Sequence, residues 1–560
     1  MFKRKIIDVL VKLTQEESVF LETPEIEDFG DYSTNVAMTL AKKEGKNPKE
    51  IAQDLTDKLK NEDLLKKEVD KIEVAGPGFI NFWLSKSALL ENLQKISEDE
   101  ENYGISDYGK GKTVLVEYSS PNIAKTFGVG HLRSTIIGQA LKNLFTVLGY
   151  KTISENHLGD WGTQFGMIIA QIVRKGLKAE DLSVENLEEL YIEFNREMKE
   201  KPDLRDEAKD WFRKLEGGDP KARKIWEVVR ETSVKEFERI YKKLGVSFEN
   251  MHGESFYEDK MPGILGEIRT KGLAKKSEGV EIVEFSDMTP AMLVKSDGTS
   301  TYFTRDLATV KYRIETFKPD LMIYEVGSDQ ILHLRQVFET AKQMGWTGSR
   351  QFVHVPHGLI RFPEGKMSTR EGKIIKLEKV LEEAVKKAHE IIDKSETGRG
   401  LSEEEKNKVA EVVGIGAIKY FDLMHHPKTD IIFDWEKIFV LQGNSAPYLQ
   451  YSYARTQSVL AKSEFQNPNP KNLDLNAEEL LILRSLIRFS EVLVSSAINF
   501  SPNLLTNYLF DLAQKYNNFY NQHRIIGGEN EIFRLMLTKE LGFVLKKGLT
   551  ILGIDTPVKM

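Results

Sequence analysis

Apolar positions follow two different periodicities along this chain. Short β-branched and aliphatic runs at 113–118, 151–154, 321–326 and 352–360 predict strands buried in a parallel sheet. Between the first two runs, apolar residues from Leu132 to Leu148 recur at helical spacing, and Gly149 supplies the stop. A strand, a helix and a second strand in this order predict a βαβ unit and therefore an α/β domain.

After Leu377 the helical periodicity is nearly continuous. Six amphipathic stretches are predicted there: 377–394, 403–424, 447–462, 478–498, 502–520 and 531–552. The first 85 residues instead mix helical spacing at 5–13 and 37–59 with strand-like runs at 71–74 and 79–83. The predicted fold class is therefore α/β, with a Rossmann-type parallel-sheet domain, a small α+β N-terminal domain and a C-terminal all-α bundle.

The same patterns suggest domain boundaries. We expect an N-terminal domain over 1–85, a linker over 86–111, the parallel-sheet domain over 112–375, a helical connector over 376–440 and a terminal helical domain over 441–560. A charged, helical segment at about 167–273 separates the first two predicted strands from the later ones. It is therefore predicted to be an insertion between the two halves of the sheet.

The loop between the first strand and its helix is the strongest candidate for a ligand site. Gly128 and Gly130 lie where the helix begins, and the unpaired N–H groups and positive dipole end of a helix start can bind phosphate. The loop is not a Walker loop, because no Gly-Lys-Ser/Thr follows a four-residue gap, and it is not a GxGxxG fingerprint. The pattern therefore predicts a phosphate-binding loop of another kind.

Gly128-Val-Gly-His131 resembles the HIGH signature of class I aminoacyl-tRNA synthetases, with Gly128 in place of the first His. The longer string from Glu117 to Thr135 looks like the form found in arginyl-tRNA synthetases. Lys366-Met-Ser-Thr-Arg370, on a loop between Gly365 and Gly372, resembles the KMSKS signature of the same class. Alone, a four-residue motif with two glycines is weak evidence, whereas several separated motifs in the family's order are strong evidence.

Both ends of the chain extend this resemblance. Gly30-Asp-Tyr-Ser-Thr-Asn35 and Gly76-Pro-Gly-Phe-Ile-Asn81 are similar to the N-terminal domain of arginyl-tRNA synthetases, which contacts the corner of the tRNA. Ala446 to Arg455 resembles the start of their helical anticodon-binding domain, the DALR type. The resemblance thus covers nearly the whole chain.

The resemblance implies an arginine–tRNA ligase. ATP would activate L-arginine to arginyl-adenylate, and the terminal adenosine of arginine tRNA would then accept the arginyl group, with release of pyrophosphate and AMP. For this reaction the protein mainly has to position the reacting groups of the substrates and neutralise negative charge on the phosphate oxygens. ATP would carry Mg²⁺ on its phosphates, because no dedicated protein metal site is evident in the sequence.

Candidate residues follow from the matched motifs. The catalytic candidates are Gly130, His131, Lys125, Lys366 and Arg370. The ATP candidates are Gly128, Gly130, His131, Lys366, Met367 and Ser368. The arginine candidates are Glu117, Tyr302 and Asp306 on the guanidinium side, with Asn122, Gln330 and His333 near the α-amino and carboxylate groups. The tRNA candidates are Asn81, Tyr448 and Arg455.

Structural alternatives exist for several of these residues. Asp306 at a predicted helix start can be an N-cap, Asn81 can be a turn residue, and the aromatics near Tyr448 can be core residues. His354 and His357 are three residues apart but lack a Cys or a carboxylate pair nearby, which disfavours metal ligation.

Length, composition and charge restrict the number of domains, the kinds of metal or disulfide site and the location of the protein. The 560 residues are too many for one core, and the chain contains no Cys, which excludes disulfides and Cys-ligated zinc or iron–sulfur sites. The net charge of −7 excludes a simple polybasic coat for RNA, although residues 441–560, with 12 basic and 10 acidic side chains, are slightly positive. No apolar run approaches a membrane span and no signal peptide is evident, so we expect a cytoplasmic monomer.

Three other functions compete with this hypothesis. Another class I synthetase of the same subclass, such as the one for cysteine, is disfavoured because its usual zinc ligands are absent. A nucleotidylyltransferase shares a HIGH-like loop but rarely has a long helical tail. A non-catalytic RNA-binding paralogue is suggested by Gly128 and would not consume ATP in the presence of arginine and tRNA.

Overall fold

The structure is a computed structural model that describes residues 2–24, 26–296, 298–362, 375–463 and 473–560. The chain forms two compact units. The first consists of residues 1–103, 455–490 and 511–545, and the second of residues 104–454, 491–510 and 546–560.

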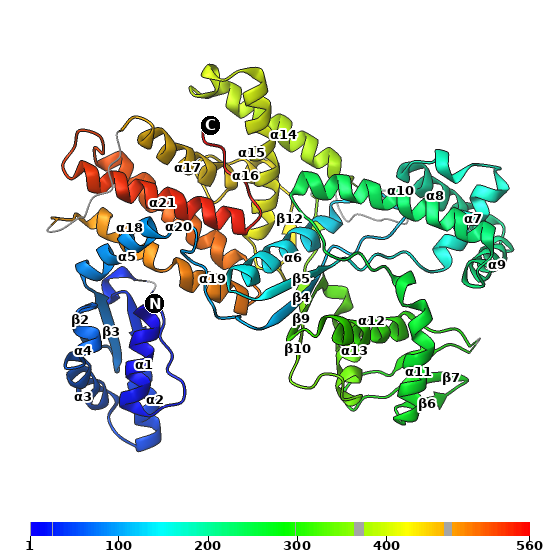
Figure 1. The fold of residues 1–560 in the computed structure, drawn as a ribbon, viewed down its shortest axis with the longest axis horizontal. Helices are drawn as coiled ribbons and strands as arrows, with labels where there is room; N and C mark the ends of the chain where they lie inside the picture. The colour runs from blue at the N-terminus through cyan, green and yellow to red at the C-terminus, as the bar shows by residue number, and fades with distance from the viewer. Residues whose placement is uncertain (1, 25, 297, 363–374, 464–472) are drawn as a thin grey trace. The chain divides into compact units, whose positions relative to one another are not determined.

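A four-stranded parallel sheet lies at the centre of the second unit. Its order is β10 (Gln351–His357), β9 (Leu321–Gly327), β4 (Thr113–Glu117) and β5 (Lys151–Glu155), as Figure 1 shows. The register places Glu117 beside Glu155 on one neighbour and beside Tyr324 on the other. The four predicted strands are confirmed, and their carboxyl ends meet at one edge, where open α/β sheets bind ligands.

Three helices position this edge. Helix α6 (Gly130–Val147) packs against β4, β5 and β9. Helix α12 (Tyr302–Phe317) and helix α13 (Ile331–Gln343) share a hydrophobic core with the sheet, in which Leu307, Met322 and Val337 are completely buried. The apolar runs predicted from the sequence therefore form the floor under the ligand edge.

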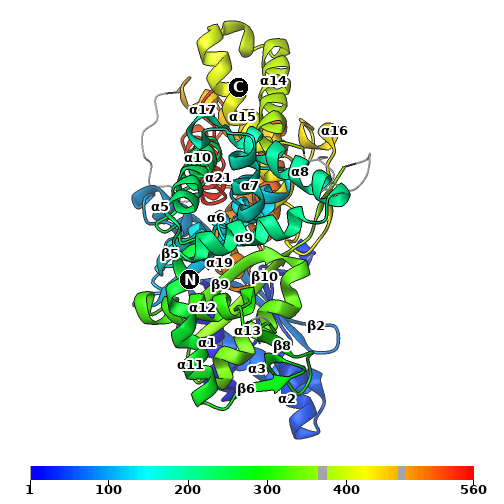
Figure 2. The ribbon, with the colours of Figure 1, turned by 90° about the vertical axis from the view of Figure 1, so that its right-hand side faces the viewer.

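The predicted insertion is helical, as expected, but it also leads into a second sheet. Helices α7 (Thr163–Arg174), α8 (Val184–Glu200), α9 (Leu204–Glu216) and α10 (Pro220–Leu244) gather in both views (Figures 1 and 2). A 3₁₀ segment (Glu254–Lys260) and helix α11 (Met261–Thr270) follow, and strands β6 (Ala274–Ser277), β7 (Val280–Val283) and β8 (Ala291–Val294) form an antiparallel sheet. The sequence reasoning missed β6 and β7, which are only four residues long and carry charged side chains.

The N-terminal module has the predicted α+β character. Strands β1 (Tyr32–Thr34), β3 (Phe79–Leu84) and β2 (Val69–Ala75) form an antiparallel sheet, and helices α1 (Phe2–Thr14) and α4 (Asp63–Lys66) belong to the same module. The predicted helix over 37–59 is two helices, α2 (Val36–Glu44) and α3 (Pro48–Lys60). Gly45, with a φ of +67°, ends the first, and the Asn47 side chain caps the second.

The segment predicted to be a linker begins with helix α5 (Lys86–Glu98). Ser85 caps this helix, and Leu89, Leu93 and Ile96 are buried on one face. Helix α5 packs against α18 (Ala477–Ile487). Its apolar spacing thus gave a helical signal that the charged residues around it obscured.

The predicted helical stretches of the last third are confirmed. Helices α14 (Leu377–Lys394), α15 (Glu403–Leu423), α16 (Trp435–Ile438), α17 (Ala446–Leu460), α20 (Asn503–Gln522) and α21 (Glu531–Ile551) follow in order. The stretch predicted over 478–498 is interrupted at Arg488, between α18 and α19 (Phe489–Ile498). Two short strands, β11 (Ile360–Arg361) and β12 (Ile431–Ile432), pair in parallel. No helix in the described ranges is long and apolar enough to cross a bilayer.

Candidate active site

The loop that joins β4 to α6 is held in an unusual backbone conformation. Ser119, Ser120 and Ala124 have φ values of 74°, 46° and 59°, in the left-handed region that non-glycine residues rarely adopt. The Ser134 hydroxyl accepts a hydrogen bond from the Ser119 amide at 2.8 Å, and the Ser119 hydroxyl is 2.7 Å from that of Tyr241. Such strain persists only where the surroundings fix it, and it is typical of a functional loop.

The start of α6 offers fewer free donors than the sequence suggested. The amides of His131 and Leu132 already donate to the carbonyls of Gly128 and Val129, at 3.0 and 3.1 Å. The tight first turn therefore uses these two amides, which leaves fewer of the predicted unpaired N–H groups for a phosphate. The described residues supply no acceptor for the Gly130 amide, and Gly130 is exposed with open space where a Cβ would stand.

His131 is prepared to act as a neutral donor. The Gly128 amide donates to its Nδ1 at 3.2 Å, so the ring proton belongs on Nε2. Burial lowers the pKa of His131 to about 4, which keeps the ring uncharged near neutral pH. Gly128 therefore contributes a backbone N–H that fixes the tautomer of the second signature histidine, although it has no side chain of its own. Lys125 lies nearby on the loop, with its ammonium 5.3 Å from the ring centre of Tyr191.

The chain returns to this loop just after the KMSKS-like segment. The Val129 amide donates to the Ile375 carbonyl at 3.0 Å, and the Leu377 amide donates to the Phe127 carbonyl at 2.9 Å. The candidates Lys366, Met367, Ser368 and Arg370 themselves lie outside the described residues. Residues 375–377 are thus attached directly to the loop that carries His131.

One cavity of about 420 Å³ brings together the six arginine candidates. Its lining includes Glu117, Asn122, Tyr302, Asp306, Gln330 and His333, together with His157 and Glu254. These residues come from the end of β4 and the loop after it, the loop after β5, the 3₁₀ segment at Glu254–Lys260, α12, the turn before α13 and the start of α13. The predicted arginine set therefore shares one small cavity, and that cavity continues from the strand and loop that lead to His131.

Asp306 does not cap a helix. Helix α12 begins at Tyr302, its N-cap is Thr301, and Asp306 lies in the second turn. The Asp306 carboxylate is 2.5 Å from Nε2 of His333 and 3.8 Å from Nε2 of His157. Burial alone would raise the pKa of Asp306, but the hydrogen bond to His333 and the nearby histidines lower it overall, so the carboxylate is charged.

The cavity contains an acid that no sequence motif identifies. Glu254 lies on the 3₁₀ segment within the predicted insertion, 3.4 Å from Arg305 through its carboxylate. Burial raises its pKa to about 7, and the neighbouring carboxylates of Asp306 and Asp160 act in the same direction. Glu254 is 52 residues from Asp306 in the sequence and matches no motif that we used, so only the folded structure reveals their shared cavity.

The two histidines considered for metal binding have other partners. His354 Nε2 is 3.0 Å from the Val326 carbonyl, and His357 Nδ1 is 2.9 Å from the Glu325 carboxylate. Within the described part of the chain, no group of three metal-ligating side chains was found.

The three tRNA candidates differ in accessibility. Asn81 is only 3% exposed on β3 and accepts a hydrogen bond from Ser33 at 2.7 Å, which favours the structural alternative for its side chain. Tyr448 is half-buried, with its ring 5.6 Å from that of Phe510. Arg455 bonds to Asn517 and stacks on Tyr520, with its guanidinium 4.7 Å from the ring centre.

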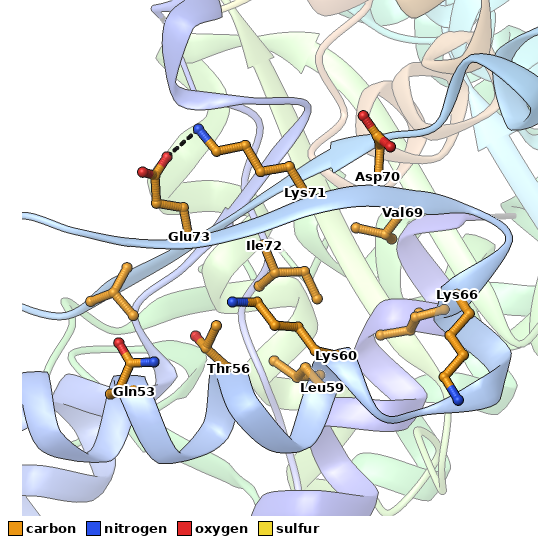
Figure 3. A pocket seen from close by; sticks show the side chains of 12 residues that line it. Gln53, Thr56, Leu59, Lys60, Lys66, Val69, Asp70, Lys71, Ile72 and Glu73 are labelled. Atoms are coloured by element: carbon orange, nitrogen blue, oxygen red, sulfur yellow. Dashed lines mark ion pairs between the residues drawn. The ribbon is translucent and has the colours of Figure 1, made fainter.

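A second hollow, of about 650 Å³, lies in the N-terminal module between α3 and β2 (Figure 3). Its rim carries both charges, and Lys71 and Glu73 form an ion pair at 2.5 Å. It contains none of the residues selected from the sequence, and its mixed charges favour no particular ligand.

Models of known protein families match most of this chain. Three family models match: the arginyl tRNA synthetase N terminal domain over residues 1–84, the class I (R) tRNA synthetase catalytic domain over 92–435 and the DALR anticodon binding domain over 449–560.

Curated relatives and solved structures give the same result. Arginine–tRNA ligases of Clostridium beijerinckii and Halothermothrix orenii are 39% and 37% identical to this chain, with 100% of each protein covered. The crystal structure of arginyl-tRNA synthetase from Plasmodium falciparum matches with a TM-score of 0.85 and 28% identity, over 100% of this chain and 99% of that one. The chain therefore belongs to the arginyl-tRNA synthetase family of class I aminoacyl-tRNA synthetases.

Proposed function

We propose that this protein is an arginine–tRNA ligase. It activates L-arginine with ATP to form arginyl-adenylate and pyrophosphate, and it transfers the arginyl group to the 3′ terminal adenosine of arginine tRNA with release of AMP. The observation that carries the proposal is the single cavity that Glu117, Asn122, Tyr302, Asp306 and Gln330 line together. A charged carboxylate at Asp306 and a second acid at Glu254 suit a planar cation with several N–H donors.

ATP binding is assigned to the neighbouring loop. Nε2 of His131 donates to a phosphate oxygen, the Gly130 amide supplies a second donor and Lys125 supplies positive charge. We include Gly128, Lys366, Met367, Ser368 and Arg370 in the nucleotide site from the resemblance to the family's two signatures. Mg²⁺ enters with ATP as part of the substrate complex.

For the tRNA we propose contacts at Tyr448 and Arg455. Arg455 and Tyr520 present a cation and an aromatic face side by side, a combination that can stack an unpaired base. The loop around Asn81 remains a proposed contact through its backbone or neighbours, because the Asn81 side chain is buried. The proposed enzyme is a monomer of the cytoplasm.

The direct test is the charging of total tRNA with labelled arginine. We expect acid-precipitable label only when ATP and tRNA are both present, and none with labelled lysine or cysteine. Equal charging with another amino acid would reject arginine as the substrate. ATP turnover without aminoacylation would favour the nucleotidylyltransferase alternative, and no ATP turnover would favour the RNA-binding paralogue.

A further inference from the structure

A buried arginine stands two positions after His131, in the first turn of α6. The Nε of Arg133 donates to Oδ1 of Asp422 on α15 at 3.1 Å, and its Nη1 donates to the carbonyl of Thr429 at 2.6 Å. Asp422 is buried as well. Because a buried guanidinium is stable only with a counter-ion and further hydrogen bonds, this pair joins the start of α6 firmly to α15 and to the chain that follows it.

The chain that follows α15, residues 427–433, is bonded in turn to β11. A Cβ on Gly358, two positions before β11, would lie 2.7 Å from the Thr429 carbonyl oxygen, so the two backbones are as close as glycine permits. Backbone hydrogen bonds of 2.8 to 3.0 Å run from the amides of Gly358, Ile431 and Phe433 to the carbonyls of Pro427, Leu359 and Arg361, respectively.

One side chain of the 427–433 segment adds to this attachment. The Asp430 carboxylate accepts a hydrogen bond from the Leu359 amide at 2.8 Å and two from the Arg361 guanidinium, at 3.0 and 2.6 Å. The Asp430 side chain is 43% exposed, whereas that of Arg133 is only 1% exposed. Asp430 can therefore be replaced without leaving an unpaired charge in the interior.

The chain is thus attached to α6 or its loop on both sides of the KMSKS-like candidates. After them, residues 375–377 are hydrogen-bonded to the loop that carries His131. Before them, β11 is bonded to the 427–433 segment, which Arg133 holds on α6. The start of a single packed helix therefore determines where the chain on either side of these candidates lies relative to His131.

We propose that Arg133 is a positioning residue for the use of ATP, which fixes β11 relative to His131 by holding the 427–433 segment on α6. This inference rests on the proposed function. Arg133 touches no substrate, because its side chain is completely enclosed, and it is absent from the lining of the proposed arginine cavity. Its loss should therefore affect ATP and spare arginine, since small errors in the placement of reacting groups are costly.

The test uses the full-length protein with Arg133→Lys and the double variant Arg133→Met/Asp422→Leu. An ammonium cannot reach both Asp422 and the Thr429 carbonyl as the guanidinium fork does. We expect Arg133→Lys to raise the KM for ATP about tenfold in arginine-dependent pyrophosphate exchange at saturating tRNA, with little change in the KM for arginine.

The double variant distinguishes positioning from stability. Replacing a buried ion pair with apolar side chains often leaves the free energy of unfolding unchanged or higher. Its Tm should therefore exceed that of Arg133→Lys. Its KM for ATP should nevertheless remain raised, because the hydrogen bond to the Thr429 carbonyl is lost.

A matched control lies in the helical domain. Arg534 has the same bonding pattern, with its Nε 2.7 Å from Oε1 of Glu479 and its Nη1 2.8 Å from the Arg524 carbonyl. Arg534→Met should lower the Tm but leave the KM for ATP unchanged at saturating tRNA. Asp430→Ala, at the exposed end of the proposed attachment, should raise the KM for ATP severalfold with little change in Tm.

Four results would overturn the proposal: equal rises in the KM for ATP and for arginine, normal use of ATP by the double variant, a rise in Arg534→Met that matches Arg133→Lys, or a normal KM for ATP in Asp430→Ala. If neither Arg133 variant folds, the Asp430→Ala result decides. Failure of the unmodified protein to charge tRNA with arginine would instead reject the proposed function.

Discussion

Among single residues, Asp306 carries the clearest expectation. Its charged carboxylate faces the cavity and is fixed by His333. Asp306→Asn keeps the shape but removes the charge, and the loss of a partly buried charge-assisted contact should raise the KM for arginine by about 10- to 100-fold. Steady-state charging kinetics with arginine and ATP varied separately measure this effect. Equal changes in both KM values would return Asp306 to a structural role.

Glu254 should make arginine binding depend on pH. Burial raises its pKa to about 7, so it is largely uncharged below that value and a carboxylate above it. A bound guanidinium favours the carboxylate, and therefore the KM for arginine should fall as the pH rises through about 7. We expect Glu254→Gln to flatten this part of the profile. A steep profile that survives the substitution would assign the titration to another group.

The same acid has an opposite effect on stability. Folding raises the pKa of Glu254 from 4.5 to about 7, so the folded protein binds more protons than the unfolded chain between these values. The free energy of unfolding therefore falls as the pH rises through this window. Glu254→Gln should have a higher Tm than the natural protein at pH 8 and little difference near pH 4. Thermal denaturation at the two pH values compares them, and a lower Tm at pH 8 would contradict the assignment.

At the scale of elements, the loop after β4 depends on a close approach to a second loop. The amides of Ile123 and Gly159 donate to the carbonyls of Gly159 and Pro121, both at 3.1 Å. A Cβ on Gly159 would lie 2.1 Å from Oδ1 of Asn122. Gly159→Ala should therefore displace the Asn122 amide and raise the KM for arginine severalfold with a nearly unchanged fold.

A matched control for Gly159→Ala is available at Gly263. Gly263 lies in α11 with open space where its Cβ would stand, so Gly263→Ala should leave the KM for arginine unchanged. Circular dichroism monitors the fold of both variants. An unchanged KM in a correctly folded Gly159→Ala variant would show that the Asn122 side chain does not bind the substrate.

Most of the elements, but not all of the site residues, could be predicted from the sequence. The four buried strands and most helices follow from local periodicity, and Gly128 to His131 is recognised because its residues are contiguous. The split between α2 and α3 was missed although Gly45 and Pro48 signal it, because the apolar spacing continues on both sides. Glu254 and Arg313 were missed for a deeper reason. Tertiary packing brings Glu254 into the cavity that Asp306 lines, and it pairs the Arg313 guanidinium with the Glu117 carboxylate; no local pattern records either arrangement.

At the scale of the whole molecule, charge is distributed unevenly for a protein that binds RNA. The total is −7, although the last 120 residues are slightly positive. Affinity for tRNA must then come from a few local sites of cation and aromatic contact, and not from a general positive field. We propose Arg455 with Tyr520 as such a site, since Asn517 and the Tyr520 ring fix the guanidinium.

This view predicts that damage at Arg455 weakens tRNA binding without touching the chemistry of arginine. Arg455→Lys keeps the charge but loses the planar stacking, and Tyr520→Leu keeps the apolar bulk but loses the ring. Because stacking of a base on such a platform contributes about 1–3 kcal/mol, each variant should raise the KM for tRNA by about 5- to 100-fold. The KM values for arginine and ATP, measured at saturating tRNA, should stay unchanged.

Arg399→Lys, at an exposed position in the short 3₁₀ turn before α15, is the matched control and should leave all three values unaltered. If both variants bind tRNA normally, the aromatic and cationic pair serves packing, and the tRNA contact must be sought elsewhere in the helical domain.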